Sequence, residues 1–398
     1  MTFIHWWERD DLSYRDGWLQ LAGMDLSYLA RSAGTPTFVY SASRVTDNLN
    51  RLSGALAHQA VPHKIFYALK ANRFLPLLTY LKLTEQCGLD VCSPNELLLA
   101  RQVGFAEQDI TYTNTSVSES DLDVLARHPQ VHVNCDALST IRRLGQRCPG
   151  RTIGIRINPQ VGAGYHAGLH YSGQKATKFG LYQDRFGEAL ALARQYDLLV
   201  KTLHFHFGSG YLTPQLEALA AALQHTHWFL DQCPTLDTLD IGGGMGLPLT
   251  AEHQPLDLAQ WSQLIASHVQ QRHLTIHVEP GDYLVKDAGV LLVQVNTVEE
   301  KGGTTFVGVN AGFNLQNLAV YYQTPFVVVP LQWDESRPRT TVTIAGNINE
   351  AIDLLAEDVV LPLPAEGDYL ALLNVGGYGA SSSSNHCMRG TFSEYLIS

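Results

Sequence analysis

The 398-residue sequence is poor in charged residues and contains no long hydrophobic run. Charged residues make up 16% of the chain, and the formal net charge is −11. A negative net charge disfavours sequence-independent binding to nucleic acid phosphates. No apolar stretch approaches the length of a membrane span, and residues 1–10 lack the basic start and apolar run of a signal peptide. We therefore expect a cytoplasmic protein that binds neither nucleic acid nor membrane.

Cysteine is scarce and shows no paired spacing. The six cysteines stand at positions 87, 92, 135, 148, 233 and 387. None of these spacings is typical of a zinc site or of a disulfide framework. Reduced thiols are therefore expected, and no metal site is predicted.

The length suggests two domains, and the first of them shows a regular alternation of strand-like and helix-like segments. The helix-like stretch Asp257–His273 has apolar residues at helical spacing and an aspartate suited to a helix N-terminus. Eight short runs are rich in apolar or β-branched residues: Ile65–Leu69, Leu89–Cys92, Ile110–Thr113, Val131–Asn134, Thr152–Ile157, Thr202–Phe207, Thr238–Ile241 and Leu274–Val278. Strands alternating with helices predict a parallel sheet. A doubly wound sheet is the alternative, but eight strands favour an α/β fold of the (β/α)8 barrel type.

After Asp282 the helical periodicity fades and strand-like runs follow one another. They are Val290–Val298, Thr304–Val309, Thr324–Leu331, Thr340–Ala345 and Tyr369–Val375. Phe3–Trp7 and Thr37–Tyr40 also have strand character, and the first is a candidate to join this second domain. We predict a barrel domain over residues 38–287 and a β-rich domain formed by residues 1–37 and 288–398.

Polar and ionisable residues follow the predicted barrel strands. In strand order they are Lys70, Asp90 with Ser93, Asn114, Asn134, Arg156, His206 with Ser209, Gly242–Gly244 and Glu279. Barrels of this type carry their active sites at the C-terminal ends of the strands. The sequence therefore predicts an active site at this rim.

Lys70 is the central candidate for the chemistry. It follows the apolar run Phe66–Leu69, and an apolar setting lowers the pKa of a lysine, as a Schiff-base lysine requires. The alternative is a lysine that only extends into solvent at a strand end.

Three further features suit a phosphorylated cofactor with an aromatic ring. Gly242–Gly244 lets backbone N–H groups approach an anion after strand seven, and the Ser209 hydroxyl can join them. Glu279 can keep a pyridine nitrogen protonated, and His206 can stack on the ring. The alternatives are an ordinary turn, a salt-bridged glutamate and a core histidine.

These segments resemble the fold-type III decarboxylases that depend on pyridoxal phosphate (PLP), the group of diaminopimelate, ornithine and arginine decarboxylases. The matching motifs, in family order, are Tyr67–Asn72, His204–Ser209, Gly242–Gly244 and Glu279–Gly281. The resemblance runs from about Thr37 to Tyr395. It implies an alanine-racemase-like barrel, a C-terminal β domain and a homodimer with shared active sites.

The resemblance also implies roles for individual residues. Lys70 is similar to the Schiff-base lysine, His206 to the ring-stacking histidine and Glu279 to the partner of the ring nitrogen. Asp90, with Glu96, matches an acidic pair behind the lysine, and Arg156 is counted with the cofactor-binding residues. The phosphate contacts implied are Ser209, Gly243, Gly244, Gly281 and Tyr378.

The chain departs from the diaminopimelate decarboxylases at the positions implied to hold substrate. Asp282 and Leu318 replace two arginines, although Tyr322 is retained. In the family, a segment of the partner chain contributes to each active site. Here this segment reads Asn349-Glu350-Ala351-Ile352-Asp353, with Asn349 in place of a cysteine that donates a proton. An amide is too weak an acid for that step. Lys70, His386 and water are the remaining donors.

The departures, with the tail Ser384–Gly390, suggest a conjugated substrate. The tail is similar to that of decarboxylases acting on citrate-linked amino acids in siderophore synthesis or on carrier-protein-bound groups. We expect decarboxylation of such a conjugate, with a carrier protein as a candidate partner. The first alternative is a free basic amino acid, its cationic end drawn to Asp282 or Glu350. A member of another class, a non-catalytic homologue that binds PLP or a partner protein, is the second.

Overall fold

The computed structural model describes residues 5–173 and 175–398, and it divides into two compact units. The barrel unit comprises Leu49–Leu247 and Gln254–Tyr283, and the β-rich unit comprises Met1–Asn48, Pro248–His253 and Leu284–Ser398. No helix among the described residues is both long and apolar enough to cross a membrane. All six cysteines carry free thiols.

The barrel unit is built on eight parallel strands that close on themselves. The strands are β5 (His63–Ala68), β6 (Gly88–Val91), β7 (Ile110–Asn114), β8 (His132–Cys135), β9 (Thr152–Arg156), β10 (Leu199–His204), β11 (Thr238–Asp240) and β12 (Thr275–Val278). Closure occurs where β12 pairs in parallel with β5, with Ile276 opposite His63. The predicted (β/α)8 barrel is therefore confirmed, and the doubly wound sheet is excluded.

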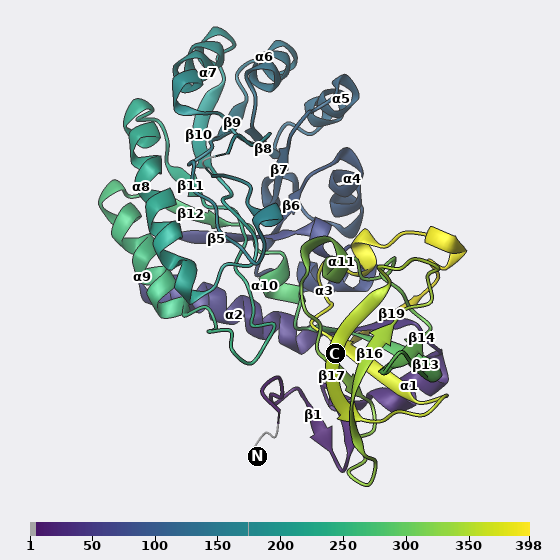
Figure 1. The fold of residues 1–398 in the computed structure, drawn as a ribbon. Helices are drawn as coiled ribbons and strands as arrows, with labels where there is room; N and C mark the ends of the chain where they lie inside the picture. The colour runs from purple at the N-terminus through teal and green to yellow at the C-terminus, as the bar shows by residue number, and fades with distance from the viewer. Residues whose placement is uncertain (1–4, 174) are drawn as a thin grey trace. The chain divides into compact units, whose positions relative to one another are not determined.

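Helices follow the strands and cover the outside of the barrel, as Figure 1 shows for α4 to α9. They are α2 (Ala42–His58), α3 (Leu75–Thr84), α4 (Pro94–Val103), α5 (Glu119–Arg127), α6 (Leu138–Arg147), α7 (Gln183–Gln195), α8 (Leu216–Gln232) and α9 (Leu258–Val269). The predicted start of α9 is confirmed, since the Asp257 carboxylate accepts hydrogen bonds from the amides of Ala259 and Gln260. Strands covered by helices on one side and packed inside the barrel on the other are buried on both faces, which explains their continuous apolar runs.

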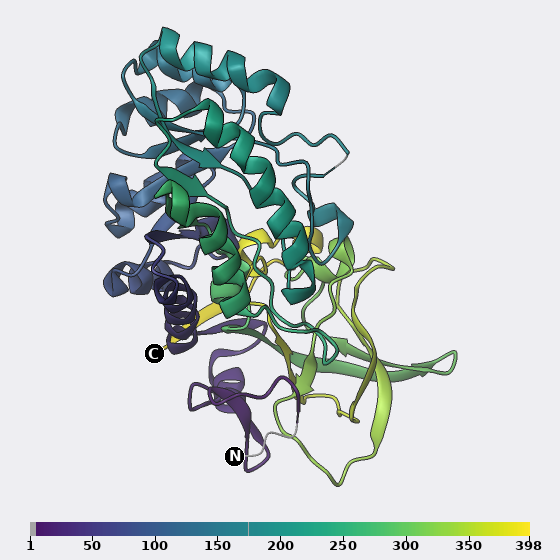
Figure 2. The same ribbon diagram turned by 90° about the vertical axis from the view of Figure 1, so that its left-hand side faces the viewer.

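The β-rich unit contains two sheets. Its strands are β1 (Leu12–Arg15), β2 (Trp18–Leu21), β3 (Met24–Asp25), β4 (Thr37–Ser41), β13 (Gly289–Lys301), β14 (Thr304–Val309), β15 (Val328–Pro330), β16 (Arg339–Ala345), β17 (Leu354–Pro362), β18 (Tyr369–Leu373) and β19 (Ser393–Ile397), and its helices include α1 (Leu26–Ala33), α10 (Asp282–Val285, which begins in the barrel unit) and α11 (Leu318–Tyr322). The first three strands form a small antiparallel sheet, and the larger sheet has the order β15-β18-β13-β14-β16-β17. The hairpin β13–β14 stands out clearly in Figure 2.

Strand β4 joins the N-terminal part of the chain to the larger sheet. It pairs antiparallel with β13 and parallel with β19, so that Val39 lies between Val290 and Tyr395. All five residues of β4 are buried. The β-rich unit therefore extends to Asn48, beyond the predicted boundary at residue 37.

Several strand assignments of the β-rich unit differ from the sequence-based expectation, since β1, β2, β3, β17 and β19 were not predicted. The predicted strand Phe3–Trp7 lies partly outside the described residues, and His5–Trp7 is not a strand. Trp7 instead packs into a hydrophobic core with Leu19 and Leu331. Strand β17 was not expected, because its exposed acidic pair Glu357–Asp358 interrupts the apolar pattern.

Candidate active site

The rim of the barrel brings together the lysine and aspartate that the sequence singled out. Lys70 lies in a single 3-10 turn, Leu69–Ala71, directly after β5. Its Nζ lies 3.6 Å from Oδ2 of Asp90 on the neighbouring strand β6. The Lys70 side chain is 46% exposed, which differs from the apolar setting that the preceding strand suggested. The turn places the lysine outside the barrel wall, and of the two side chains only the Asp90 carboxylate is buried.

Asp90 is a buried acid next to an exposed amine. Burial raises the pKa of its carboxyl to about 8; the Glu279 carboxylate adds to the rise, and Lys70 opposes it. One oxygen of Asp90, Oδ1, is buried without a hydrogen-bond partner among the described residues. Near neutral pH the carboxyl can therefore hold or release a proton beside the lysine amine.

Glu279 follows β12 and is paired with a histidine that the sequence analysis did not single out. The Nε2 of His204, the last residue of β10, lies 3.1 Å from Oε2 of Glu279, and both side chains are buried. Burial lowers the pKa of His204, so we assign a neutral ring that donates from Nε2. Burial alone would raise the pKa of Glu279, but the contact with His204, with help from Lys70, lowers it to about 2. Glu279 is therefore an anion.

The second oxygen of Glu279 provides a test for a pyridine-containing cofactor. Oε1 is buried and has no hydrogen-bond partner among the described residues. A buried carboxylate oxygen left without a donor is costly. A protonated ring nitrogen is a donor of the right kind, so the residues present fit a pyridinium ring.

His206 lies just beyond β10, surrounded by the expected neighbours. Its Nδ1 accepts a hydrogen bond from the Gly243 amide at 3.3 Å, its Nε2 lies 3.5 Å from the Ser209 hydroxyl, and its ring meets that of Tyr171 edge to face at 4.7 Å. Burial, with the positive charges of Lys70 and Arg156, holds the pKa of His206 well below its usual value. The ring is therefore neutral and suited to packing on an aromatic cofactor.

The glycine run after β11 packs so closely against neighbouring backbone that it has no space for side chains. A Cβ at Gly243 would lie 2.1 Å from the Glu279 carbonyl oxygen, and one at Gly244 would lie 2.0 Å from that of Gly208. Gly244 also has a φ of +93°, which favours glycine. These clashes require glycine here, and the bare backbone can approach a phosphate closely.

Arg156, at the end of β9, is the buried cation of this rim. Its guanidinium lies 4.7 Å from the centre of the Phe179 ring. Burial lowers its pKa, while Asp136, Glu279 and Asp90 oppose the decrease. A guanidinium remains charged under these conditions, and it offsets the acids around it.

The β-rich unit holds the other predicted residues, and it brings two of them together. The Nε2 of His386 lies 3.2 Å from Oε1 of Glu350, and both side chains are well exposed. Asn349 is also exposed. The Asp353 carboxylate is buried and accepts hydrogen bonds from the amides of Phe313 at 2.7 Å and Ile348 at 2.6 Å, so it organises two loops of its own unit.

The remaining predicted residues have simpler surroundings. Leu318 is buried at the start of α11, and Tyr322 ends that helix, half-buried. Tyr378 has a φ of +57°, and its carbonyl accepts the Ser382 hydroxyl. Asp282 begins α10, directly after the buried Gly281.

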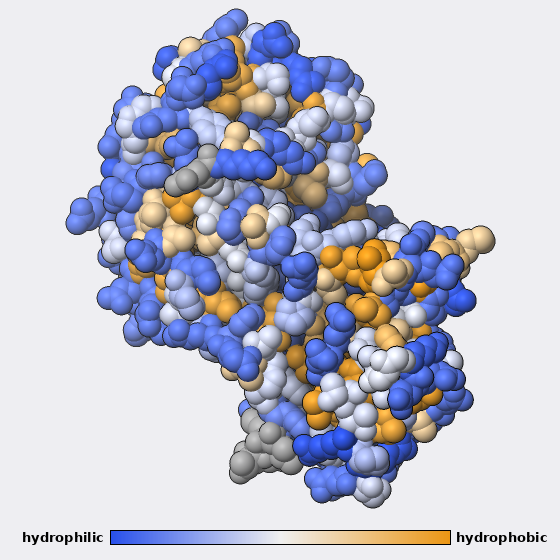
Figure 3. All heavy atoms as spheres, viewed as in Figure 1, coloured by the Kyte–Doolittle hydropathy of each residue, from blue (hydrophilic) through white to orange (hydrophobic). Residues whose placement is uncertain are grey.

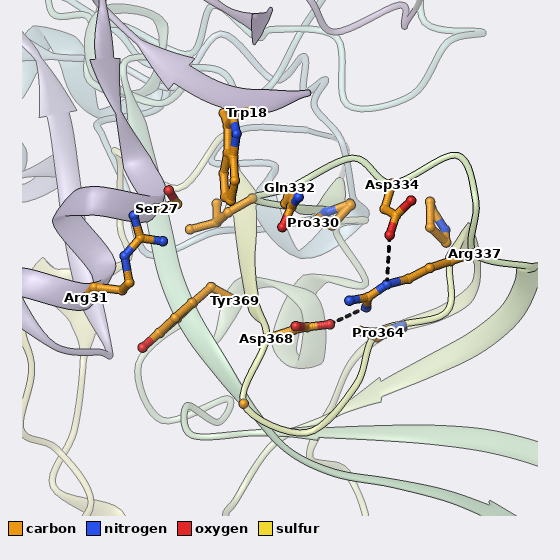
Figure 4. Close-up of a pocket in the computed structure, with 13 residues that line it drawn as sticks. Trp18, Ser27, Arg31, Pro330, Gln332, Asp334, Arg337, Pro364, Asp368 and Tyr369 are labelled. Carbon is orange, nitrogen blue, oxygen red and sulfur yellow. Dashed lines mark hydrogen bonds and ion pairs between the residues drawn. The ribbon is translucent and has the colours of Figure 1, made fainter. Parts of the chain in front are cut away.

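A separate hollow lies within the β-rich unit and contains none of these residues. Figure 4 shows Trp18, Arg31 and Tyr369 on its walls. Arg337 bridges Asp334, at 3.4 Å, and Asp368 across it. These ion pairs tie neighbouring loops together, and we assign the hollow no chemistry.

His204 and Asp240 are the buried site residues that sequence reasoning missed. His204 stands two residues before His206, and Asp240 stands two before Gly242. In an extended strand, residues two apart share a face. That spacing was the available signal.

Comparisons with known proteins agree with this geometry. Residues 44–286 match the family model of the pyridoxal binding domain of pyridoxal-dependent decarboxylases. The chain is 33% identical to diaminopimelate decarboxylase from Methanothermobacter thermautotrophicus over 401 residues, covering 97% of this chain and 92% of that protein. Two solved structures are similar: diaminopimelate decarboxylase from M. jannaschii (TM-score 0.89, 26% identity, 98% of this chain and 93% of that one) and the Helicobacter pylori enzyme complexed with L-lysine (TM-score 0.86, 25% identity, 94% of each chain).

The chain belongs to the pyridoxal-dependent decarboxylase family, with the alanine-racemase-like barrel and mostly β C-terminal domain of that fold. Its cofactor is pyridoxal phosphate, and it is a carboxy-lyase acting on an amino acid.

The expectation of a conjugated substrate is wrong. Relatives that match over 97% or more of the chain are diaminopimelate decarboxylases, named for a free amino acid. The siderophore role and the carrier protein were inferred from the same seven-residue tail, and they lose their support with it. A short exposed segment carries far less information than similarity over the full length.

Proposed function

We propose that this enzyme decarboxylates a free diamino acid, either a basic amino acid or diaminopimelate, the neutral diamino acid for which its relatives are named. The observation that carries the proposal is the arrangement of Lys70 beside Asp90 with the anionic Glu279 on the same barrel rim. Full-length similarity to diaminopimelate decarboxylases supports a free amino acid. A related enzyme whose structure holds L-lysine, a free basic amino acid, supports the same class.

Each rim residue has a task in this proposal. When bound, PLP withdraws electrons from the substrate Cα and so eases loss of the α-carboxylate as CO2. Lys70 holds the cofactor by its amine and yields that position to the substrate amine. Asp90 takes up or releases a proton beside Lys70. Glu279 accepts the ring N–H through Oε1.

The phosphate and the ring face are held by neighbouring groups. The Gly243 and Gly244 backbone and the Ser209 hydroxyl form the phosphate cradle, and Gly281 and Tyr378 are further candidates. His206 packs on the ring as a neutral group. Arg156 balances the buried acids behind it.

We also propose a homodimer in which each site receives residues from the partner chain. Figure 3 shows hydrophobic side chains on the surface at α11. Three segments with predicted site residues each expose a large apolar side chain: Tyr321 is 60% exposed, Ile352 53% and Met388 86%. Exposed apolar residues that cluster with functional ones are typical of an interface. Asn349 and Glu350, both exposed, would then act in the partner's site, and the buried Asp353 would hold the loop that carries them.

The substrate is tested by direct measurement of CO2 release. The holoenzyme is assayed with diaminopimelate, lysine, ornithine and arginine, and a Lys70→Ala preparation serves as the blank. We expect turnover of at least one of these free amino acids. Release of CO2 only from amide- or ester-linked derivatives would contradict the proposal.

A further inference from the structure

Asp240 is a buried acid to which the proposed reaction assigns no task. It is the last residue of β11 and is completely buried. Its Oδ1 accepts a hydrogen bond from the Gly242 amide at 2.9 Å. Its Oδ2 is also buried and has no hydrogen-bond partner among the described residues. A buried carboxyl group with one unused oxygen requires an explanation.

The explanation lies in its two neighbours. His204, Asp240 and Glu279 each bring one side-chain nitrogen or oxygen atom to within 4.8 Å of those of the other two. Two adjacent buried carboxyls cannot both carry a charge in a medium of low polarity. Glu279 has the His204 N–H and the charge of Lys70 to stabilise its anion. Burial and Glu279 raise the pKa of Asp240 well above its usual value, so the proton resides on Asp240.

This cluster of one histidine and two carboxyls could also be read as a metal site. The 3.1 Å hydrogen bond between His204 and Glu279 argues against that reading, because it already uses one atom from each of two prospective ligands. A proton on Asp240 removes the third. We therefore interpret the three residues as a hydrogen-bonded group around the Glu279 anion.

We propose that His204 and the protonated Asp240 are positioning residues that fix Glu279 as an anion and leave its Oε1 for the cofactor's ring nitrogen. His204 donates to Oε2 and sets the orientation of the carboxylate. Asp240 presents a neutral O–H to Glu279 and is itself held by the Gly242 amide. This inference rests on the proposed role of Glu279.

The test separates contact with the ring nitrogen from general damage to the site. Holoenzymes are reconstituted with PLP or with its carba analogue, in which C–H replaces the ring nitrogen, and the dissociation constants are measured by equilibrium dialysis. A charge-assisted hydrogen bond corresponds to about tenfold to a hundredfold in affinity. We expect His204→Phe and Asp240→Leu to weaken PLP binding by about this factor and to change binding of the carba analogue little.

Conservative variants refine the assignment. Gln at position 204 and Asn at position 240 both keep an N–H donor without charge. We expect Asp240→Asn and His204→Gln to recover most of the affinity, to within about threefold of the parent. The infrared difference spectrum of the parent minus Asp240→Asn should contain a protonated-carboxyl band, while the band of Asp90 remains in both proteins.

Three results would overturn the inference. The first is equal loss of affinity for PLP and for the carba analogue in His204→Phe and Asp240→Leu, which indicates a merely structural role. The second is a loss of PLP affinity in Asp240→Asn that equals the loss in Asp240→Leu. The third is stoichiometric zinc in the purified protein. Glu279→Ala separates the two hypotheses. If it weakens binding of PLP and of the carba analogue equally, the proposed role of Glu279 fails. If it weakens PLP binding alone, while His204→Phe and Asp240→Leu weaken both equally, only the inference fails.

Discussion

The Nζ of Lys70 lies 3.6 Å from Oδ2 of Asp90, and the Asp90 side chain is only 1% exposed. The amine therefore faces both solvent and a buried carboxyl. This contact places a proton acceptor where the lysine must give up and regain a proton. It connects the lysine that we propose to hold the cofactor to the acids inside the barrel.

Lys70→Ala should abolish decarboxylation, with a loss of more than about a thousandfold, because Lys70 supplies the amine proposed to hold the cofactor. The visible absorption band of the lysine-bound cofactor should disappear, and circular dichroism should stay unchanged. Lys301→Ala, at the exposed tip of β13, is the matched control and should behave as the parent. Full activity in Lys70→Ala would refute the assignment.

Asp90→Asn should change how stability depends on pH in the cofactor-free protein. The folded pKa of Asp90 is raised from 3.8 to about 8, so the folded state binds the proton more tightly than the unfolded state. Its stabilising contribution is complete below pH 4 and is lost as pH rises through 8, at about 1.4 kcal/mol per pKa unit. The melting temperature of the variant, relative to the parent, should therefore be higher at pH 8 than at pH 5. A difference independent of pH would contradict this.

Asp282→Arg should favour substrates with a distal carboxylate. A guanidinium attracts a carboxylate with charge-assisted hydrogen bonds, whereas an aspartate repels it. We expect the ratio of kcat/KM for diaminopimelate to that for lysine to rise by about tenfold or more. Asp282→Asn, which removes only the repulsion, should give a smaller rise. An unchanged ratio in both variants would place Asp282 outside the substrate site.

Mixtures of two inactive variants should test the shared site. If Glu350 acts in the partner's site, hybrid dimers of Lys70→Ala and Glu350→Ala chains contain one intact site of two. We expect the mixture to recover about a quarter of the parental activity when subunits exchange at random. Glu366→Ala, an exposed glutamate of the same unit, should be fully active alone. No recovery despite demonstrated exchange would argue against a site that includes Glu350 from the partner.

The barrel could be predicted because each strand leaves a local signal. Runs such as Ile110–Thr113 are apolar throughout, since both faces are covered, and polar residues follow them at the rim. Strand β17 left no such signal, because Glu357 and Asp358 lie in its exposed part. Thr37–Tyr40 was recognised as a strand, but its place in the other unit depends on pairing with β13, about 250 residues away.

Sequence motifs identified single candidate residues of the site, and they missed the pairs on which its chemistry depends. Lys70, Glu279 and His206 stand in recognisable segments. The pairing of Glu279 with His204 joins residues 75 positions apart, and the burial that protonates Asp240 is a property of the packed barrel. Neither is visible in a linear sequence. The substrate was misjudged because Asp282 and the tail were read without the context of full-length relatives.

The position of β4 determines when the β-rich unit can finish folding during synthesis of the chain. During translation β4 emerges from the ribosome before the whole barrel. The two strands that pair with β4, which are β13 and β19, emerge only after the barrel. Barrel strands find partners near them in the chain, whereas a buried strand at residues 37–41 must wait for residues 393–397. Bringing such distant segments together carries a larger entropic cost than local pairing. The last few residues of the chain therefore close the β-rich unit, and a nascent protein that stops before Ser393 leaves one edge of β4 open to other strands.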